Sequence, residues 1–132
     1  MAMKINNDNY YNTNVEVYHS TTIENYNKIK LKGELIPTDH IFFNKIFTNR
    51  LHLSTDLRAH KRMIRAIADE REGFDLKDIL TLTILYPSYV PEGSDCYDIE
   101  YKNCSLDNNS NYDGYSIITS NSIEISRITK VE

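Results

Sequence analysis

The chain has 132 residues, enough for one domain with its own core, and 40% of them are hydrophobic, which excludes extended disorder. Charged residues make up 26% and sum to a net charge of −4, which argues against wrapping of duplex nucleic acid, since that needs a basic face. No stretch reaches the roughly 20 apolar residues of a membrane-spanning helix, and the polar N-terminus lacks the apolar centre of a secretory signal. We therefore expect a soluble cytoplasmic domain with no membrane partner.

Residues 1–13 are rich in Asn and Tyr without periodicity, and we expect them to form a polar N-terminal arm before a single domain over residues 14–132. The two cysteines, Cys96 and Cys104, lie in a polar stretch, and all four histidines precede them. This arrangement has no standard zinc spacing, so we expect free thiols and no metal site.

The first predicted unit is a strand followed by a helix. Residues 15–18 alternate apolar and polar side chains, which predicts a strand that runs into His19. Thr21 is followed three residues later by Glu24, a capping-box pattern, and Gly33 stands where a helix would stop. We therefore expect a short helix between the Thr21 region and Gly33.

A second unit repeats this order. Residues 50–54 alternate as a strand, and Ser54 or Thr55 is expected to cap a helix that has Asp56 in its first turn. Gly73 is expected to end that helix.

The rest of the chain is mostly strand and turn. Residues 38–49 predict a loop or irregular helix, whereas the β-branched run 79–86 predicts a central strand that Pro87 ends. A turn-rich region follows, and residues 114–119 and 123–131 alternate as two closing strands. This order of elements indicates an α+β domain.

Both strand-to-helix units place small hydroxyl side chains at a helix start, where unpaired N–H groups favour an anion or an amide. They are His19-Ser20-Thr21 in the first unit and Ser54-Thr55 in the second. A histidine at a strand end can bind a ribose hydroxyl or transfer a proton. Taken singly, each pattern is also what an ordinary helix cap looks like.

Together and in this order, the segments 18–21 (Tyr-His-Ser-Thr) and 50–56 (Arg-Leu-His-Leu-Ser-Thr-Asp) resemble the diphtheria-toxin-like branch of the ADP-ribosyltransferase superfamily. The first is similar to the family's opening strand, whose helix leaves through a Gly-Leu exit, here near Gly33 and Leu35. The second resembles a segment shared with RNA 2′-phosphotransferases. Matching positions scatter over residues 15–131, and only the two short motifs are specific. The resemblance implies a small ADP-ribosyltransferase-like fold with a split β-sheet core and two main helices.

The resemblance further implies that NAD is the substrate. His19 would contact the ribose on the nicotinamide side, and Ser20 and Thr21 would line the same pocket. Ser54 and Thr55 would support the nicotinamide or the phosphates. No metal is expected.

The family also places a carboxylate, usually a Glu before a closing strand, where it supports the oxocarbenium-like transition state. Here Asp113 and Gly114 precede Tyr115, with no Glu. Asp113 is the best substitute, although Asp-Gly is also a turn pattern, and Glu100 is its rival. Tyr26 is a candidate for stacking on the nicotinamide or adenine.

The activity implied is cleavage of NAD, release of nicotinamide and mono-ADP-ribosylation of a host macromolecule. The acceptor would be a host protein, such as a subunit of a nucleic-acid-binding complex, because small members of this family include phage anti-CRISPR proteins and toxin-system transferases. The site of action would be the host cytoplasm. One alternative is an RNA 2′-phosphotransferase-like or nucleic-acid-modifying enzyme. Another is a catalytically inactive module that blocks a protein partner.

The alternative chemistry on RNA would draw on arginines around the second predicted helix, which can also be read as a solvated helix face. These are Arg50, Arg58, Arg62 and Arg65. His52 is expected to face away from its leucine neighbours, and His60 is expected on the charged side of the helix. Neither histidine is assigned a role.

Overall fold

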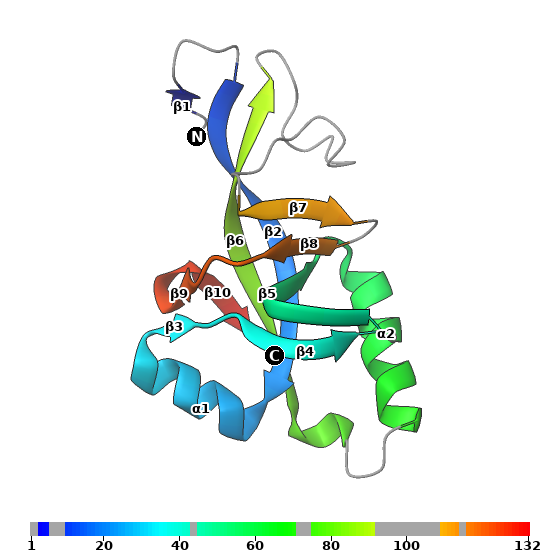
Figure 1. The fold of residues 1–132 in the computed structure, drawn as a ribbon. Coiled ribbons are helices and arrows are strands. Elements are labelled where there is room, and N and C mark those ends of the chain that lie inside the picture. The colour runs from blue at the N-terminus through cyan, green and yellow to red at the C-terminus, as the bar shows by residue number, and fades with distance from the viewer. Residues whose placement is uncertain (1–2, 6–9, 43–44, 71–74, 92–108, 114–115) are drawn as a thin grey trace.

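A mostly antiparallel sheet with two α-helices forms the structure, which confirms the α+β class (Figure 1). The computed structural model describes residues 3–5, 10–42, 45–70, 75–91, 109–113 and 116–132. The main sheet contains eight strands: β1 (Met3–Ile5), β2 (Tyr10–Thr22), β4 (Thr38–Phe42), β5 (Lys45–Ser54), β6 (Ile79–Pro91), β7 (Ser110–Asp113), β8 (Ser116–Thr119) and β10 (Ile128–Val131). A separate pair joins β3 (Glu34–Leu35) and β9 (Ile123–Glu124). The helices are α1 (Ile23–Lys32), α2 (Leu57–Glu70) and the short 3-10 turns Leu76–Asp78 and Ile125–Arg127.

Two long strands form the axis of the molecule, because β2 and β6 pair without interruption from Tyr10↔Pro91 to Thr22↔Ile79. Within the predicted arm, residues 3–5 and the start of β2 are strand. The predicted stop at Pro87 is wrong. β10 pairs with β6 only as far as Ile84, so Pro87 lies where β6 has only β2 as a neighbour among the described strands, a position that tolerates a missing N–H.

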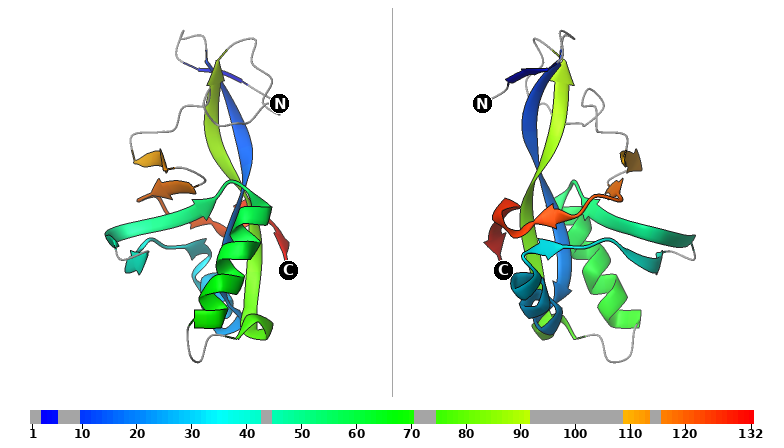
Figure 2. Two further views of the ribbon diagram at one scale, coloured as in Figure 1. Left: turned by 90° about the vertical axis from the view of Figure 1, so that its right-hand side faces the viewer. Right: turned by 60° about the vertical axis from the view of Figure 1, so that its left-hand side comes forward.

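The main sheet is divided where β2 meets β5, since the only register pair between these strands is Tyr18↔Ser54. Beyond this point β5 pairs with β4 and β8 instead. Figures 1 and 2 show β4, β5 and β8 crossing over the β2/β6 pair. One half of the sheet is thus β10-β6-β2 and the other is β5-β8-β7 with β4.

The prediction of a loop or irregular helix over residues 38–49 is wrong, because this segment supplies β4 and the first half of β5. The two strands pair through Ile41↔Ile46 and Phe42↔Lys45. Isoleucine and phenylalanine have a high propensity for strands. Pairing with a neighbouring strand also gives hydrogen-bond partners to backbone N–H and C=O groups that would lack them in a loop.

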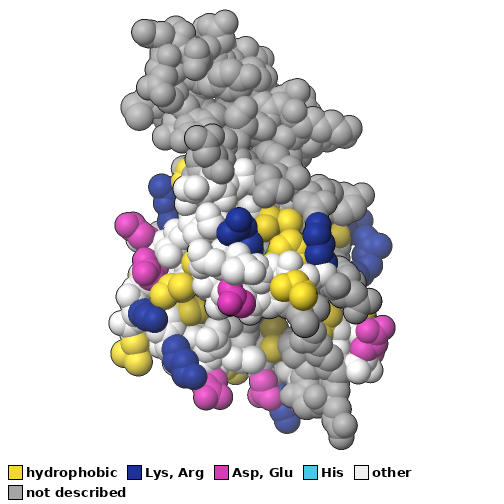
Figure 3. All heavy atoms as spheres, in the orientation of Figure 1, with side chains coloured by type: hydrophobic (Ala, Val, Ile, Leu, Met, Phe, Trp, Pro, Cys, Tyr) yellow, Lys and Arg dark blue, Asp and Glu magenta, His cyan; other side chains and the backbone are white. Residues whose placement is uncertain are grey.

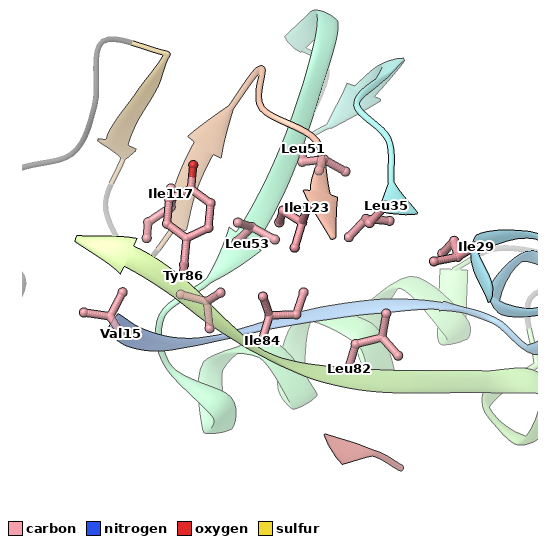
Figure 4. Close-up of a cluster of buried hydrophobic side chains, with 11 residues drawn as sticks. Val15, Ile29, Leu35, Leu51, Leu53, Leu82, Ile84, Tyr86, Ile117 and Ile123 are labelled. Atoms are coloured by element: carbon pink, nitrogen blue, oxygen red, sulfur yellow. The ribbon is translucent and has the colours of Figure 1, made fainter. Parts of the chain in front are cut away.

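The hydrophobic core fills the angle between the two halves of the sheet (Figure 4). Val15 of β2 and Ile84 of β6 face Leu53 of β5 and Ile117 of β8, and all four are fully buried. The predicted central strand 79–86 is therefore confirmed, and alternate residues of it line the core. The two closing strands are confirmed in part, since a 3-10 turn separates β9 from β10.

Helix α1 begins and ends close to its predicted limits. The Thr22 hydroxyl accepts a hydrogen bond from the Asn25 N–H at 3.0 Å, and Gly33 adopts φ 82 and donates its N–H to the Ile29 carbonyl at 2.9 Å. The cap is thus one residue later than predicted. The Thr21 hydroxyl instead accepts from the Asn25 side chain.

Helix α2 is capped by Asp56, whose carboxylate accepts a hydrogen bond from the Ala59 N–H at 3.0 Å. The predicted cap at Ser54 or Thr55 is therefore wrong, because Ser54 still belongs to β5. The predicted stop at Gly73 lies outside the described residues. Across the described ranges, neither helix has the length and apolar character needed to cross a membrane.

Candidate functional site at the junction of two strands

The two hydroxyl-bearing motifs meet in the structure, because the single β2–β5 pair joins Tyr18 to Ser54. Helix α1 starts just after β2 ends, and α2 starts two residues after β5 ends. The junction therefore brings together the ends of two strands. It also joins residues more than thirty positions apart in the sequence, as in the hydrogen bond between the His19 ring and the His52 carbonyl.

His60 of α2 bridges the two strands. Its Nε2 lies 2.6 Å from the Ser20 Oγ, and its Nδ1 lies 2.6 Å from the Ser54 Oγ. The Ser20 Oγ also lies 3.0 Å from the Thr81 Oγ1 of β6. His60 is only 4% exposed, so this chain of hydroxyl and imidazole groups is a buried polar contact between α2 and the sheet.

The prediction that His60 lies on the charged side of its helix is wrong. His60 stands three residues after Leu57 and four before Ile64, so helical spacing puts it on the apolar face with them. That spacing was the signal in the sequence that could have revealed its position. The two serines it would bond could not be identified from the sequence, since they lie on different strands.

The environment keeps His60 neutral. Burial, and to a smaller extent the nearby His19, lower its pKa from an ordinary 6.5 to about 4. A neutral imidazole has one N–H donor and one acceptor nitrogen. His60 therefore donates to one serine and accepts the hydroxyl proton of the other.

His19 is fixed in one tautomer by β5. Its Nδ1 lies 3.1 Å from the His52 carbonyl oxygen, so Nδ1 carries the proton and donates it. Burial lowers the pKa of His19; the bond to the His52 carbonyl works in the opposite direction, and His40 lowers this pKa again. Nε2 is then an acceptor, and it makes no hydrogen bond to any residue that the structure describes.

His19 and Ser20 point to opposite faces of the β2/β6 pair. Successive side chains of a strand alternate, and His19 lies opposite the buried Leu82 whereas Ser20 lies opposite Thr81 and bonds to it. The expectation that both line one pocket is therefore wrong. Ser20 belongs to the face covered by α2.

Two more histidines extend the cluster along β4 and β5. The His40 Nε2 lies 2.7 Å from the His52 Nδ1, and the Phe47 ring packs against both imidazoles with centroid distances of 5.5 and 4.4 Å. His52 lies on the face opposite Leu51 and Leu53, as predicted: both leucines are buried and it is half-buried. Over the described residues, no three His, Cys, Asp or Glu side chains are grouped so that they could hold a metal ion.

The remaining site candidates are spread more widely. Thr55 is half-buried between β5 and α2, next to the junction. Thr21 is buried and its hydroxyl accepts from the side chain of Asn25 within α1. Tyr26 packs against the hydrophobic core, with the Lys30 ammonium 5.1 Å from its ring centroid. We find no contact that links Tyr26 with the described junction residues.

Asp113 stands at the end of β7, in register with the junction. Successive register pairs are Asp113↔Ser116, Ser116↔Ser54 and Ser54↔Tyr18, so one row across the sheet joins them. Two strand spacings of roughly 4.8 Å each separate Asp113 from Ser54 along this row. The side chain of Asp113 and the rival Glu100 lie outside the described residues.

A second polar network, which the sequence did not reveal, surrounds the buried Tyr86 hydroxyl. It donates to the Thr119 Oγ1 at 3.0 Å and lies 2.6 Å from the Ser110 Oγ. Tyr86 also borders an open hollow of about 340 Å³ with Asn121 and Arg127 among its lining residues. This network ties β6 to β7 and β8, the half of the sheet that carries Asp113.

Comparison with protein-family models, curated proteins and solved structures finds no match to this chain. The geometry of the junction is therefore the basis for any functional assignment. It offers the oriented neutral imidazole of His19, the hydroxyl groups of Ser20 and Ser54, and Asp113, which shares a register row with Ser54.

Proposed function

We propose that the protein is an NAD-dependent mono-ADP-ribosyltransferase with an ADP-ribosyltransferase-like split sheet, and that its NAD site is the β2–β5 junction. The observation that carries the proposal is the Tyr18↔Ser54 pair, which brings the two motifs together where the strands end and leaves Asp113 in the same register row as Ser54. The Ser54 side chain lies on the face covered by α2 and the His19 side chain on the other face, so the proposed site is the edge where β2 and β5 end. The resemblance of the two motifs to the transferases supports the same assignment. Neither motif would point to it without the other.

His19 orients the substrate in this proposal. Its Nδ1–H is held by the His52 carbonyl, so Nε2 presents a lone pair that accepts a hydrogen bond from a ribose hydroxyl. The lowered pKa of His19 keeps that lone pair available at neutral pH. Ser54 and Thr55 stand before the start of α2, and the proposal gives them contacts with the nicotinamide or the phosphates. The Asp56 carboxylate already accepts from the Ala59 N–H at this helix start, so an amide, which carries no charge, fits here better than a phosphate.

The reaction breaks the bond between ribose C1′ and the nicotinamide nitrogen, and nicotinamide leaves with the bonding electron pair. A nucleophile of the acceptor then forms a bond to C1′ and loses its proton. A carboxylate supports the positive charge that develops on the ribose and takes up this proton. Asp113 is the proposed carboxylate.

The proposed acceptor is a host protein, with a subunit of a nucleic-acid-binding complex as the first candidate. The net charge of −4 suits a partner with a basic surface. On the face seen in Figure 3, acidic and basic side chains are intermixed. The acceptor therefore has to be identified by experiment rather than from a charged patch on this face.

The test is release of nicotinamide from NAD, measured with and without bacterial lysate and followed by mass spectrometry of modified lysate proteins. We expect His19→Ala and Asp113→Asn each to lower the rate by about 100-fold or more, within the range for loss of an acid–base or electrostatic group. Asp78→Asn removes a carboxylate outside the proposed NAD contacts, and we expect it to keep the rate within about threefold.

Absence of both nicotinamide release and calorimetric NAD binding would overturn the proposal and favour a catalytically inactive module that blocks a partner. Release that survives Asp113→Asn but not His19→Ala would instead move the carboxylate to Glu100.

A further inference from the structure

The outer face of α2 carries a stripe of positive charge. Four basic residues recur at intervals of three and four along the first two-thirds of the helix, and all are exposed: Arg58, Lys61, Arg62 and Arg65. We call this set the basic stripe. In the left view of Figure 2, α2 lies in front of the β2/β6 pair, and no other helix or strand covers its outer side.

The basic stripe opposes the stability of its own helix. Like charges at these spacings repel one another, and positive charge near a helix N-terminus is unfavourable to the helix dipole. Helix α2 has no acidic residue in its first turn and no basic residue in its last, whereas α1 has Glu24 in the first turn and Lys30 and Lys32 in the last. Among the described residues, no carboxylate forms an ion pair with the stripe. An anionic partner would relieve this repulsion.

A hollow adjoins the stripe between α2, the Leu76–Asp78 turn and β6. It measures about 220 Å³ and is lined by Lys61, Ile64, Arg65, Leu76, Ile79 and Thr81. Among the described residues, its lining thus combines two cations and a hydroxyl with three aliphatic side chains and contains no carboxylate. Leu76 is 44% exposed, so the aliphatic wall is open to a ligand.

We propose that the basic stripe and this hollow bind single-stranded nucleic acid, with phosphates on the stripe and an unpaired base against the aliphatic wall. Arginine provides three of the four charges, and its planar guanidinium matches a phosphate with paired hydrogen bonds. The stripe from Arg58 to Arg65 spans about 10 Å of helix, enough for more than one phosphate.

Single-stranded nucleic acid fits better than the other anionic polymers. Duplex nucleic acid hides its base faces, and the aliphatic wall would then have nothing to contact. The carboxylates of an acidic peptide would pair with the cations, but they would leave the aliphatic wall of the hollow exposed as well. The binding does not depend on the proposed transfer of ADP-ribose, because the stripe lies on the outer side of α2 and the imidazole of His60 on its buried side.

The experiment measures fluorescence anisotropy of labelled single-stranded RNA and DNA of about 12 nucleotides, a usual site length, at two salt concentrations. The double variant Lys61→Gln/Arg65→Gln removes both cations of the hollow. Lys28→Gln/Lys32→Gln removes two exposed cations from α1 and is the matched control for net charge. Circular dichroism checks that each variant keeps its helices.

We expect Lys61→Gln/Arg65→Gln to weaken binding at least tenfold. The slope of log affinity against log salt concentration should fall by the amount expected for about two lost phosphate contacts, whereas the control variant should keep its affinity within about twofold. Leu76→Ser should weaken the oligonucleotide about fivefold without changing the affinity for inorganic polyphosphate, which has no bases. Preference for RNA or for DNA identifies the natural strand.

No oligonucleotide binding at low salt would overturn the proposal. Equal loss in the hollow and control variants would overturn it too, because net charge alone would then account for the affinity. Equal affinity for polyglutamate would assign the stripe to an acidic protein. All of these measurements omit NAD, so they succeed or fail separately from the test of nicotinamide release.

Discussion

The two helices follow similar strand-to-helix sequences but attach to the sheet in different ways. In α1 the buried residue is Ile29, which joins the hydrophobic core. In α2 the buried residue is His60, which hydrogen-bonds to a serine on each of two strands. Apolar packing does not depend strongly on the direction of approach, so it allows a helix some freedom of position. Two hydrogen bonds of 2.6 Å are directional and therefore fix where α2 lies on the sheet.

This difference has consequences for function. A neutral imidazole between Ser20 and Ser54 fastens α2 across the point where the sheet divides, and this is also the point where His19 is oriented. The α2 attachment is therefore sensitive to protonation, whereas the α1 attachment is not. The following predictions test this contrast, from the largest expected effect to the smallest.

Truncation of the apolar attachment should cost the most. Ile29→Ala removes a side chain that is 6% exposed, and we expect it to lower the free energy of unfolding by about 3 kcal/mol through lost burial and the remaining cavity. Leu31→Ala on the same helix is the control, because Leu31 is 91% exposed and its loss should change stability by less than about 0.5 kcal/mol. Urea unfolding of both variants measures the difference. Equal effects would show that α1 is not held by Ile29.

Removal of the polar attachment should cost slightly less. His60→Ala leaves the Ser20 and Ser54 hydroxyls without their imidazole partner, and we expect a loss of about 2 kcal/mol. Ser20 keeps Thr81 as a partner, which limits the effect. The same urea titration measures it, and Ser54→Ala should show about half of the loss. A neutral result for His60→Ala would mean that the bridge does not stabilise the fold.

The smallest expected effect is the dependence on pH. His60 binds a proton below about pH 4 when folded but near its ordinary pKa of 6.5 when unfolded, so its contribution is complete above the unfolded value and is lost as pH falls toward 4. We expect His60 to account for a loss of about 1 to 2 kcal/mol between about pH 7 and about pH 5. His19, whose pKa is also lowered, adds a loss of the same sign.

The variant His60→Gln separates the two histidines, because glutamine does not titrate in this range and His19 is retained. Thermal unfolding at several pH values should show a shallower slope for this variant than for the wild type. Parallel slopes would mean that His60 titrates normally in the folded protein.

Local patterns were the most informative part of the sequence. The alternation in residues 15–18 and 79–86 and the glycine stop at Gly33 correctly predicted β2, β6 and the end of α1. The first part of the hairpin over residues 38–54 was not predicted. Isoleucine and phenylalanine occur in buried loops, on helix faces and in strands, and only the pairing of β4 with β5 shows which of these structures forms.

For the candidate site, the sequence named His19, Ser20 and Ser54, but not His60, which connects the two serines. His60 was left without a role because an imidazole among arginines resembles a solvated residue, although its spacing from Leu57 and Ile64 is that of a buried face. The sequence prediction placed His19 and Ser20 in one pocket, although strand alternation puts neighbouring side chains on opposite faces. Which of the two faces α2 covers could not be predicted from the sequence.

The sequence by itself thus determined the α+β class, the presence of strands at residues 15–18 and 79–86, the limits of α1 and the start of α2 to within a residue or two, because these depend on short-range periodicity and capping. The tertiary structure decided that β2 and β5 touch through one residue pair, that His60 spans Ser20 and Ser54, and that Asp113 lies in the same row of the sheet. Each of these is a contact between segments distant along the chain. Such contacts form only when strands choose their partners and register, and local propensity does not encode that choice.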